Sequence, residues 1–574
     1  MFLNLPVFRS RDARMLFFGT AAITVGVELW ANALSKPGAG GGLTPIFLQL
    51  FSVGDYAGAN SALVILCAAA LVSERFSFRP LLRWIGAHPG PVAAASTVAL
   101  SAGALLVYHD HPLSMDEFSV FFQSQVFASG HLTGQFPLPL IDWLVPRLFQ
   151  NWFLDVSHST GQVASPYWPS FALLLAPFTA LGIPWACNPL ISGLTVLAAH
   201  RLALRIFGDV EAAGLTILLI VASPIFFADG ISYYTMPAHL LANTTYALLL
   251  IQPTPRRAFA AGLVGSVALT LHNPVPHMLF AVPWLFWVAR SRAGAVSLAA
   301  LLAGYLPLVL LLGFGWFEFA SQLTHQGTLT IGTDATADSL VQMGAAFDVP
   351  SMTLLLARAI GVAKTWIWAV PGLLLLACVG GWKWRREPTC RLLIASATIT
   401  FLGYIVVPFD QGHGWGFRYF HPAWIVLPVL GAGALTRKAS GDEHGSASPR
   451  TAVFEDTGSR TFVVACALLT LTIGVGFRAV QMGEFISKLM HQEPAYAGAE
   501  RRVVIIDPAG SFYGSDLVRN DPWLRGNVIR MITHGAAADA DMMHTQFPEL
   551  HRVWAGRFGS VWSAAPEPPV GSPQ

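Results

Sequence analysis

The sequence predicts an α-helical membrane protein with many crossings, and three observations support this prediction. Of its 574 residues, 54% are hydrophobic and 11% are charged, whereas soluble domains average about 25% charged residues. Apolar runs long enough to cross a bilayer recur along the chain. Arginine and lysine clusters separate these runs, which is the pattern of cytoplasmic helix ends. An ordinary soluble globular protein is therefore excluded.

Charge and cysteine usage exclude several other classes. The net charge of +2 is too small to indicate a nucleic-acid partner. The five cysteines are scattered without the spacing of a disulfide framework or a zinc site. The chain carries neither a phosphate-binding Walker loop nor a dinucleotide fingerprint. We therefore expect no cofactor and no nucleic acid, and membrane lipids as partners.

The basic clusters set the order of the first spans. The runs Met15–Leu34 and Tyr56–Val72 form a hairpin with arginines at both cytoplasmic ends. The third run, Val92–Val107, then carries Asp116 and Glu117 to the outer face. Two adjacent carboxylates thus lie where a span meets water, and acids at such positions are functional candidates.

The next crossings leave two alternatives open. Between the outer Asp116 and the inner Arg201 the number of crossings must be odd, yet two apolar runs intervene, Ser170–Ile183 and Pro189–Phe207. Either Ser170–Ile183 dips into the membrane without crossing, or Arg201 breaks the charge rule. The first alternative gives about 13 crossings, with the N-terminus inside and the C-terminus outside.

We expect three regions along the chain. Residues 1–90 form an N-terminal transmembrane hairpin, 91–478 a transmembrane core, and 479–574 a small extracytoplasmic α+β region, in which Arg502–Asp507 reads as a buried strand. Four outer loops belong to the core: 108–169, 229–235, 317–352 and 410–422. The polar stretch Ser440–Ser459 reads as a cytoplasmic loop.

A helix is predicted to start at Ser114. Ser114 and Glu117 have the spacing of a capping box, which leaves Asp116 without a structural part. The helix should rest on the membrane surface, with an apolar face toward the membrane and a polar face away from it. The apolar face holds Phe118, Phe121, Phe122 and Val126, and the polar face holds Ser119, Gln123 and Ser124.

The fourth outer loop, 410–422, offers donors to an anion. Three glycines permit its backbone to turn back on itself. Arg418 with His413 and His421 supplies N–H groups suited to a phosphate. A plainer interpretation remains, in which Arg418 reaches lipid headgroups and Trp415 belongs to an interfacial aromatic belt.

Several features in order resemble the lipid-carrier-dependent glycosyltransferases of the GT-C superfamily, which include aminoarabinose transferases and protein O-mannosyltransferases. The features are the acidic pair Asp116-Glu117, Gly130, Tyr167-Trp168-Pro169, Ala203 to Gly208, and Ser223-Pro224-Ile225-Phe226-Phe227. The resemblance implies transfer of a sugar from a polyprenyl-phosphate donor to a lipid, glycan or protein acceptor outside the cytoplasm. It also implies that Asp116, with Glu117 beside it, is the catalytic base. The chain departs from the family at Thr235, where many members have a second acid.

The chemistry of such a transfer assigns the remaining candidates. A base takes the acceptor proton while cations hold the leaving phosphate, so we expect inversion at the sugar carbon. The candidate phosphate-binding residues are Arg418, His413 and Arg147, and the candidate substrate-binding residues are Tyr419, Tyr167, Asp229 and His239. A divalent metal is compatible with two acids and a phosphate, but no spacing requires one.

Two other classes stay open. A transporter or flippase of a lipid-linked substrate would also have many spans, usually with matched broken helices in two halves. A non-catalytic relative of the family is the second alternative, suggested by Thr235. For the enzyme we expect a multi-pass protein of the inner (plasma) membrane whose active site, including Asp116 and Arg418 in one cavity, faces outward.

Overall fold

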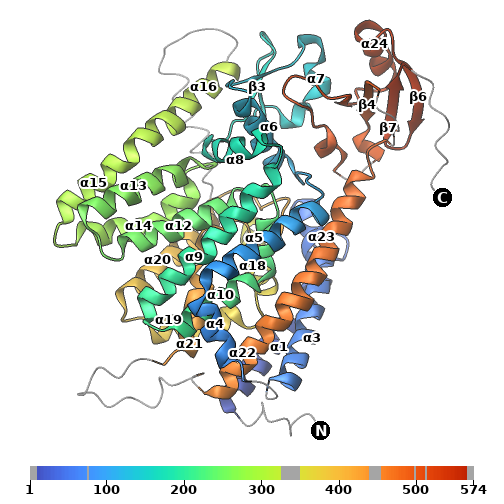
Figure 1. Cartoon of the computed structure of the whole chain (residues 1–574). Coiled ribbons are helices and arrows are strands. Elements are labelled where there is room, and N and C mark those ends of the chain that lie inside the picture. Colours follow the sequence, from blue (N-terminus) through green and yellow to red (C-terminus); the bar gives the residue numbers. More distant parts are fainter. Residues whose placement is uncertain are drawn as a thin grey trace, which may run out of the picture. The chain divides into compact units, whose positions relative to one another are not determined.

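The computed structural model of the chain consists mainly of helices (Figure 1). It describes residues 10–73, 77–324, 350–437, 454, 456–494, 496, 500–510 and 513–564. Most of the predicted outer loop 317–352 and of the loop 440–459 lies outside these residues. The chain divides into two compact units, the first with residues 1–107, 188–309 and 336–481, and the second with 108–187, 310–335 and 482–574.

The described helices confirm a multi-pass membrane protein. Seven of them are long and apolar enough to cross a bilayer, and a bent pair of helices, 210–221 with 224–230, raises the number to eight if it forms one span. Shorter apolar helices accompany them at 170–180, 275–289, 373–383 and 426–435. The count of about 13 crossings stays a prediction.

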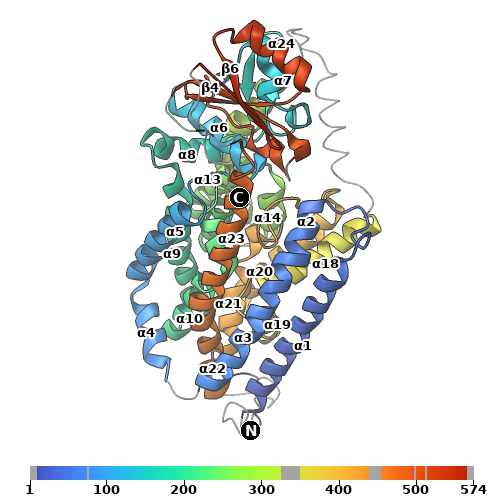
Figure 2. The same cartoon turned by 90° about the vertical axis from the view of Figure 1, so that its right-hand side faces the viewer.

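The first unit is a bundle of helices, in which α1, α3 and α22 lie side by side (Figures 1 and 2). Its elements are α1 (Arg11–Leu34), α2 (Pro45–Gln49), the π-helical η3 (Leu50–Asp55), α3 (Tyr56–Val72), α4 (Arg79–Ala87), α5 (Pro89–Leu106), α9 (Cys187–Phe207), α10 (Val210–Val221), α11 (Pro224–Gly230), α12 (Met236–Leu250), α13 (Pro255–Thr270), α14 (Val275–Ala289), α15 (Gly294–Leu308), α18 (Met352–Ile367), α19 (Leu373–Lys383), α20 (Pro388–Gly403), η8 (Tyr404–Val406), η9 (His421–Ala423), α21 (Val426–Leu435), α22 (Thr457–Leu469), the π-helical η11 (Thr470–Gly474) and α23 (Val475–Met490), whose last turns belong to the second unit.

Glycines let pairs of these helices approach closely. A Cβ atom on Gly262 of α13 would lie 2.2 Å from the carbonyl oxygen of Leu301 on α15. A Cβ on Gly380 of α19 would lie 1.8 Å from the carbonyl oxygen of Leu430 on α21. Helices in lipid associate through such close packing, because the lipid chains are as apolar as the side chains.

The Ser-Pro segment breaks a span. Helices α10 and α11 meet at an angle of 63°, because Pro224 lacks the N–H that would continue α10. The hydroxyl of Ser223 donates to the carbonyl oxygen of Leu219 at 2.7 Å, and the backbone N–H of Ile225 donates to the carbonyl oxygen of Trp368 at 3.0 Å. Polar groups freed by the break are thus bonded inside the protein, as a membrane requires.

The second unit combines short helices with two sheets. Its helical elements are α6 (Met115–Ala128), η4 (Leu138–Leu140), α7 (Ile141–Leu144), η5 (Arg147–Phe149), α8 (Ser170–Ala180), η6 (Pro184–Ala186), the π-helical η7 (Val309–Phe314), α16 (Gly315–Thr324), η12 (Pro508–Gly510), η13 (Gly514–Leu517) and α24 (Ala536–Gln546). Strands β1 (Gly134–Gln135), β3 (Gln162–Ala164) and β2 (Asp155–Val156) form one antiparallel sheet in that order.

The second sheet has the order β5-β4-β7-β6. Its strands are β4 (Arg502–Ile506), β5 (Val528–Ile532), β6 (His551–Gly556) and β7 (Gly559–Ser563). Strand β4 occupies the predicted buried strand and pairs in parallel with β5, with Val504 opposite Arg530. It pairs antiparallel with β7, and α24 connects β5 to β6.

Helix α8 bears on the alternatives for Ser170–Ile183. It has 11 residues, which is about 16 Å of helix at 1.5 Å per residue. A hydrocarbon core is about 30 Å thick, so α8 is too short to cross it alone. This length favours the alternative in which the segment enters the membrane without crossing.

Helix α6 confirms the predicted start at Ser114, but its polar face differs from the expectation. The apolar side chains Phe122 and Val126 are buried inside the protein, in one hydrophobic core with Phe136 and Val503, rather than turned to the membrane. The polar side chains of Ser119, Gln123 and Ser124 are also fully buried rather than turned to water. Their hydrogen-bond partners are Ser165, which follows β3, and Thr179 of α8.

Candidate functional site

Asp116 lies in the first turn of α6 with its side chain half-buried. The hydroxyl of Tyr167, just before α8, donates to Oδ1 of Asp116 at 2.6 Å. This distance is typical of a charge-assisted hydrogen bond between a hydroxyl and a carboxylate, which is stronger than a neutral one. The contact therefore fixes the direction of the carboxylate. Two predicted site residues, one catalytic and one substrate-binding, are thus brought into direct contact.

Buried polar side chains of α6 position Tyr167. Oε1 of Gln123 accepts from the backbone N–H of Ser165 at 2.9 Å, and the hydroxyls of Ser119 and Ser165 lie 2.6 Å apart. Oγ of Ser165 accepts from the backbone N–H of Tyr167 at 3.2 Å. The segment that carries Tyr167 is therefore bonded to the same helix that carries Asp116.

Glu117 has a structural part. Its side chain is fully buried, and Oε2 accepts from the backbone N–H groups of Leu113 at 2.6 Å and Ser114 at 3.2 Å. The capping box predicted with Ser114 is present. These contacts engage the Glu117 carboxylate in the start of α6, whereas the Asp116 side chain next to it is half-buried.

The C-terminal region adds charged groups beside this helix start. The guanidinium of Arg519 donates to the carbonyl oxygens of Pro112 and Leu113 and approaches Nε2 of His111. Burial raises the pKa of Asp516 to about 7, with Arg519 opposing and the charge of Asp116 adding to the rise. At neutral pH a titrating carboxyl thus lies within electrostatic reach of Asp116. Arg519 was not predicted, because no local motif marks it.

Arg147, a predicted phosphate-binding residue, lies on the surface of the second unit. Its side chain is 78% exposed and pairs with Asp142 at 2.8 Å. Exposed ion pairs of this kind contribute little to stability. Its guanidinium already donates to Asp142, so a donor phosphate would compete with that carboxylate for Arg147.

In the first unit, the glycine-rich loop 410–422 adopts the predicted turns. Gly412, Gly414 and Gly416 have φ values of 57°, 114° and 56°, which glycine adopts without strain. Arg358 of α18 holds the start of the loop: its buried guanidinium donates to the carbonyl oxygens of Tyr404, Val407 and Phe409 at 2.6 to 2.8 Å. No sequence pattern indicates this role, because Arg358 lies in an apolar run.

Arg418 is buried inside this loop. Its guanidinium donates to the carbonyl oxygen of Gln411 and lies 4.6 Å from the centre of the Tyr234 ring. The side chain of Gln411 bonds back to the loop, with Nε2 donating to the carbonyl oxygen of Gly416 at 2.9 Å. Nδ1 of His413 accepts from the backbone N–H of Gly414 at 3.1 Å. The loop therefore presents Arg418 and His413 from a fixed backbone.

Three further candidate residues remain, one within this loop and two in helices α11 and α12. The hydroxyl of Tyr419 donates to the carbonyl oxygen of Asp410 at 2.9 Å, which gives the ring a structural part. Asp229, at the end of α11, is buried with Oδ2 3.2 Å from Nε2 of His421. His239 of α12 is buried too, and neither ring nitrogen has a hydrogen-bond partner among the described residues.

Asp116 belongs to the second unit, whereas Arg418, His413, Asp229, His239 and Tyr419 belong to the first. Their meeting in one outward cavity stays a prediction. Within the described residues, no three His, Cys, Asp or Glu side chains gather closely enough to hold a metal ion.

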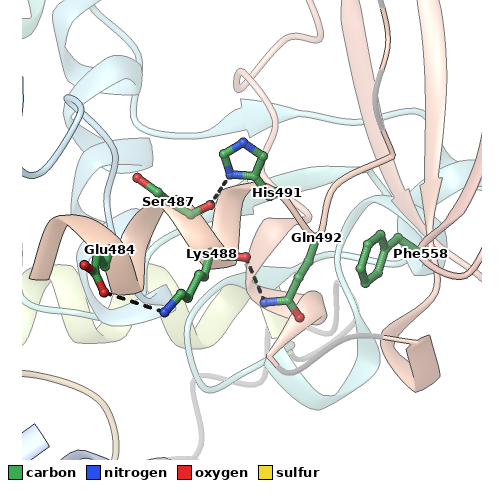
Figure 3. A pocket seen from close by; sticks show the side chains of 6 residues that line it. All are labelled: Glu484, Ser487, Lys488, His491, Gln492 and Phe558. Carbon is green, nitrogen blue, oxygen red and sulfur yellow. Dashed lines mark hydrogen bonds and ion pairs between the residues drawn. The ribbon is translucent and has the colours of Figure 1, made fainter. Parts of the chain in front are cut away.

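A concavity of about 580 Å³ lies along the end of α23 (Figure 3). Glu484, Lys488 and His491 line it with exposed side chains. Their polar groups bond along the same helix: Nζ of Lys488 lies 3.7 Å from Glu484, and Nδ1 of His491 lies 2.6 Å from the carbonyl oxygen of Ser487. These side chains do not converge on a common point as those of a binding site do.

Comparisons with known proteins identify the fold. No protein-family model matches the chain, and no curated protein matches it. Among solved structures it is similar to ArnT from Cupriavidus metallidurans bound to undecaprenyl phosphate, with 12% identity and a TM-score of 0.51 over 82% of this chain and 97% of that one. The chain is also similar to ArnT from the same organism in the apo state, with 12% identity and a TM-score of 0.47 over 83% of this chain and 97% of that one. For an oligosaccharyltransferase from Archaeoglobus fulgidus, the identity is 13% and the TM-score is 0.41 over 76% of this chain and 62% of that one.

The first prediction separates a structural from a catalytic Glu117. Glu117→Gln keeps an oxygen that accepts from Leu113 and Ser114, so we expect unchanged activity and stability. Glu117→Ala removes the acceptor of these two buried N–H groups, which costs about 1–3 kcal/mol, and should lower the melting temperature. Thermal unfolding and transfer assays of both variants check this. A folded Glu117→Gln variant without activity would show that the acid itself is needed.

The second prediction concerns pH. The carboxyl of Asp516 has a pKa of about 7 in the folded chain and about 4 in the unfolded chain. Folding therefore takes up a proton between these values, so stability should fall as the pH rises through this window. Asp516→Asn should flatten this dependence in melts from pH 4 to pH 8. Asp541→Asn, at an exposed acid of α24, is the control and should keep the wild-type slope.

Proposed function

We propose that this protein, whose fold is that of the GT-C superfamily, is a membrane glycosyltransferase. It moves a sugar from a polyprenyl-phosphate donor to a lipid, glycan or protein acceptor on the outer face of the plasma membrane. The contact between Asp116 and Tyr167 is the observation that carries the proposal. This contact leaves the Asp116 carboxylate of the first outer loop accessible and oriented, whereas the neighbouring Glu117 belongs to the helix cap.

Asp116 acts as the general base in this proposal. An acceptor hydroxyl gives its proton to the carboxylate while its oxygen forms a bond to the anomeric carbon. The bond from that carbon to the phosphate oxygen breaks, and the bonding pair leaves with the polyprenyl phosphate. Attack from the face opposite the phosphate inverts the anomeric centre and needs no second nucleophile. The hydroxyl of Tyr167 holds the carboxylate in one orientation.

Arg418 binds the donor phosphate. A guanidinium carries five N–H donors in a planar fork that matches phosphate oxygens. In the described loop the side chain is buried, and charge-assisted hydrogen bonds are strongest where water is excluded. A Cβ on Gly412 would meet no atom within 4 Å, so there is open space beside this turn. The related fold of ArnT, solved with undecaprenyl phosphate, supports a polyprenyl carrier.

A transporter remains the alternative function. Its main support is the broken span α10–α11, since transporters bind substrates at discontinuous helices. Transporters usually show such breaks in matching positions of two halves, and a single bent pair is found in the described part of the chain. Sugar transfer by the purified protein would distinguish the enzyme from the transporter.

The third prediction tests the base. Asp116→Asn should lower sugar transfer at least about 100-fold, because a positioned base contributes 10² to 10⁴, while donor binding and melting temperature stay unchanged. Transfer is measured with purified protein in nanodiscs. Asp541→Asn makes the same chemical change at an exposed acid of the same unit and should retain full activity. Turnover retained by Asp116→Asn would exclude this residue as the base.

The fourth prediction tests the phosphate site. Hydrogen bonds to charged groups are worth about 1.5–3 kcal/mol, so Arg418→Gln should weaken donor binding about tenfold or more. The measurement is the rise in melting temperature on titration with polyprenyl phosphate. Arg437→Gln, at an exposed arginine of the same unit, should bind the donor like wild type. Equal donor affinity of Arg418→Gln and wild type would remove this assignment.

A further inference from the structure

Three charged side chains meet inside the first unit, and the proposed function uses none of them. They are Asp55 at the end of η3, Lys364 in α18 and Arg478 in α23. Nζ of Lys364 lies 2.8 Å from Oδ2 of Asp55, and Nη2 of Arg478 lies 3.0 Å from Oδ1. The indole of Trp368 also donates to Oδ1, at 2.6 Å. The three charged side chains, which we call the cation cluster, are at most 3% exposed.

The cation cluster is not neutral. Both cations pair with Asp55, and no other carboxylate of the described chain forms an ion pair with either of them. The remaining partners carry no charge: Nη1 of Arg478 donates to the carbonyl oxygen of Gly54 at 3.0 Å and to Oε1 of Gln481 at 2.6 Å, and the guanidinium lies 4.0 Å from the centre of the Trp368 ring. One positive charge is left over, and an uncompensated buried charge costs several kcal/mol.

A small cavity adjoins this excess charge. It has a volume of about 20 Å³, and its lining includes Arg478, Ser61, Gly58 and Gly474. A cavity needs about 10–15 Å³ to hold one water molecule. It is therefore large enough for a single particle of that size.

The local backbone is unusual on both sides of the cavity. The π-helical segment η3 ends at Asp55, and the π-helical segment η11 ends at Gly474, four residues before Arg478. Such segments are rare in proteins, and those that do occur are often found at functional sites. A Cβ atom on Gly58 would lie 2.0 Å from Nη2 of Arg478, so the guanidinium fits here only against glycine.

We propose that this cavity binds one small monovalent anion, chloride under physiological conditions. The anion neutralises the excess charge of the cation cluster and accepts hydrogen bonds from Arg478 and from the hydroxyl of Ser61. It thereby stabilises the junction of α3, α18 and α23. The proposal does not depend on the proposed function, since its test measures ion binding and stability rather than sugar transfer.

The experiment is a chloride titration of the full-length protein in detergent, with gluconate keeping the ionic strength constant. A ligand that binds only the folded state raises its stability with concentration, so the melting temperature of the wild type should rise with chloride and reach a plateau. Lys364→Met leaves a neutral pair of Asp55 and Arg478. Its melting temperature should be independent of chloride.

Lys383→Met is the matched control. It removes a lysine of the same unit that donates to the carbonyl oxygens of Ala434 and Thr436, so the chloride response should persist. Anomalous diffraction from crystals grown in bromide gives a second measurement that needs no variant, and a peak beside Arg478 is expected. If the melting temperature of the wild type did not change with the chloride concentration, Lys364 would be neutral and the proposal would be overturned. Absence of the bromide peak would overturn it as well.

Discussion

The hydrogen bonds between α6 and the segment before α8 are the interaction on which the candidate site depends. Gln123, Ser119 and Ser165 are buried, and each has its partner among the others. An unpaired buried polar group costs about 1–3 kcal/mol, so these contacts permit few other arrangements of the two segments. Asp116 and Tyr167 project from the segments fixed in this way, which explains how a half-exposed carboxylate keeps one orientation.

The glycine-rich loop is held by the same kind of constraint in the first unit. Its turns leave backbone carbonyl groups without helix or sheet partners, and buried groups of this kind need other donors. Arg358 bonds to the carbonyl oxygens of Tyr404 and Val407 just before the loop, and Gln411 bonds to that of Gly416 within it. Satisfying the backbone with side-chain donors gives a rigid turn rather than a flexible one. A rigid turn is what a phosphate site needs, because donors held in place lose little entropy on binding.

Local sequence predicted the features that local rules govern. The spacing of Ser114 and Glu117 predicted the capping box, which is confirmed. The glycines of 410–422 permit a backbone that turns back on itself, and they have positive φ values in the structure. The apolar runs predicted the membrane class for the same reason. The burial of Gln123 was missed, because its partner Ser165 lies 42 residues away. Lys364 and Asp55 are 309 residues apart, so no window of sequence could join them.

Glu211 is a second carboxylate that pairs with several cations, and it differs from the cation cluster in its exposure to water. Glu211 pairs with Arg79, Arg83 and Arg460, and thus also faces more positive than negative charge. There Arg79 and Arg83 are 62% and 60% exposed, so water solvates the excess. Lys364 and Arg478 have no such contact with water. The same ratio of charges is tolerable at one site through hydration, and at the other it requires a bound anion.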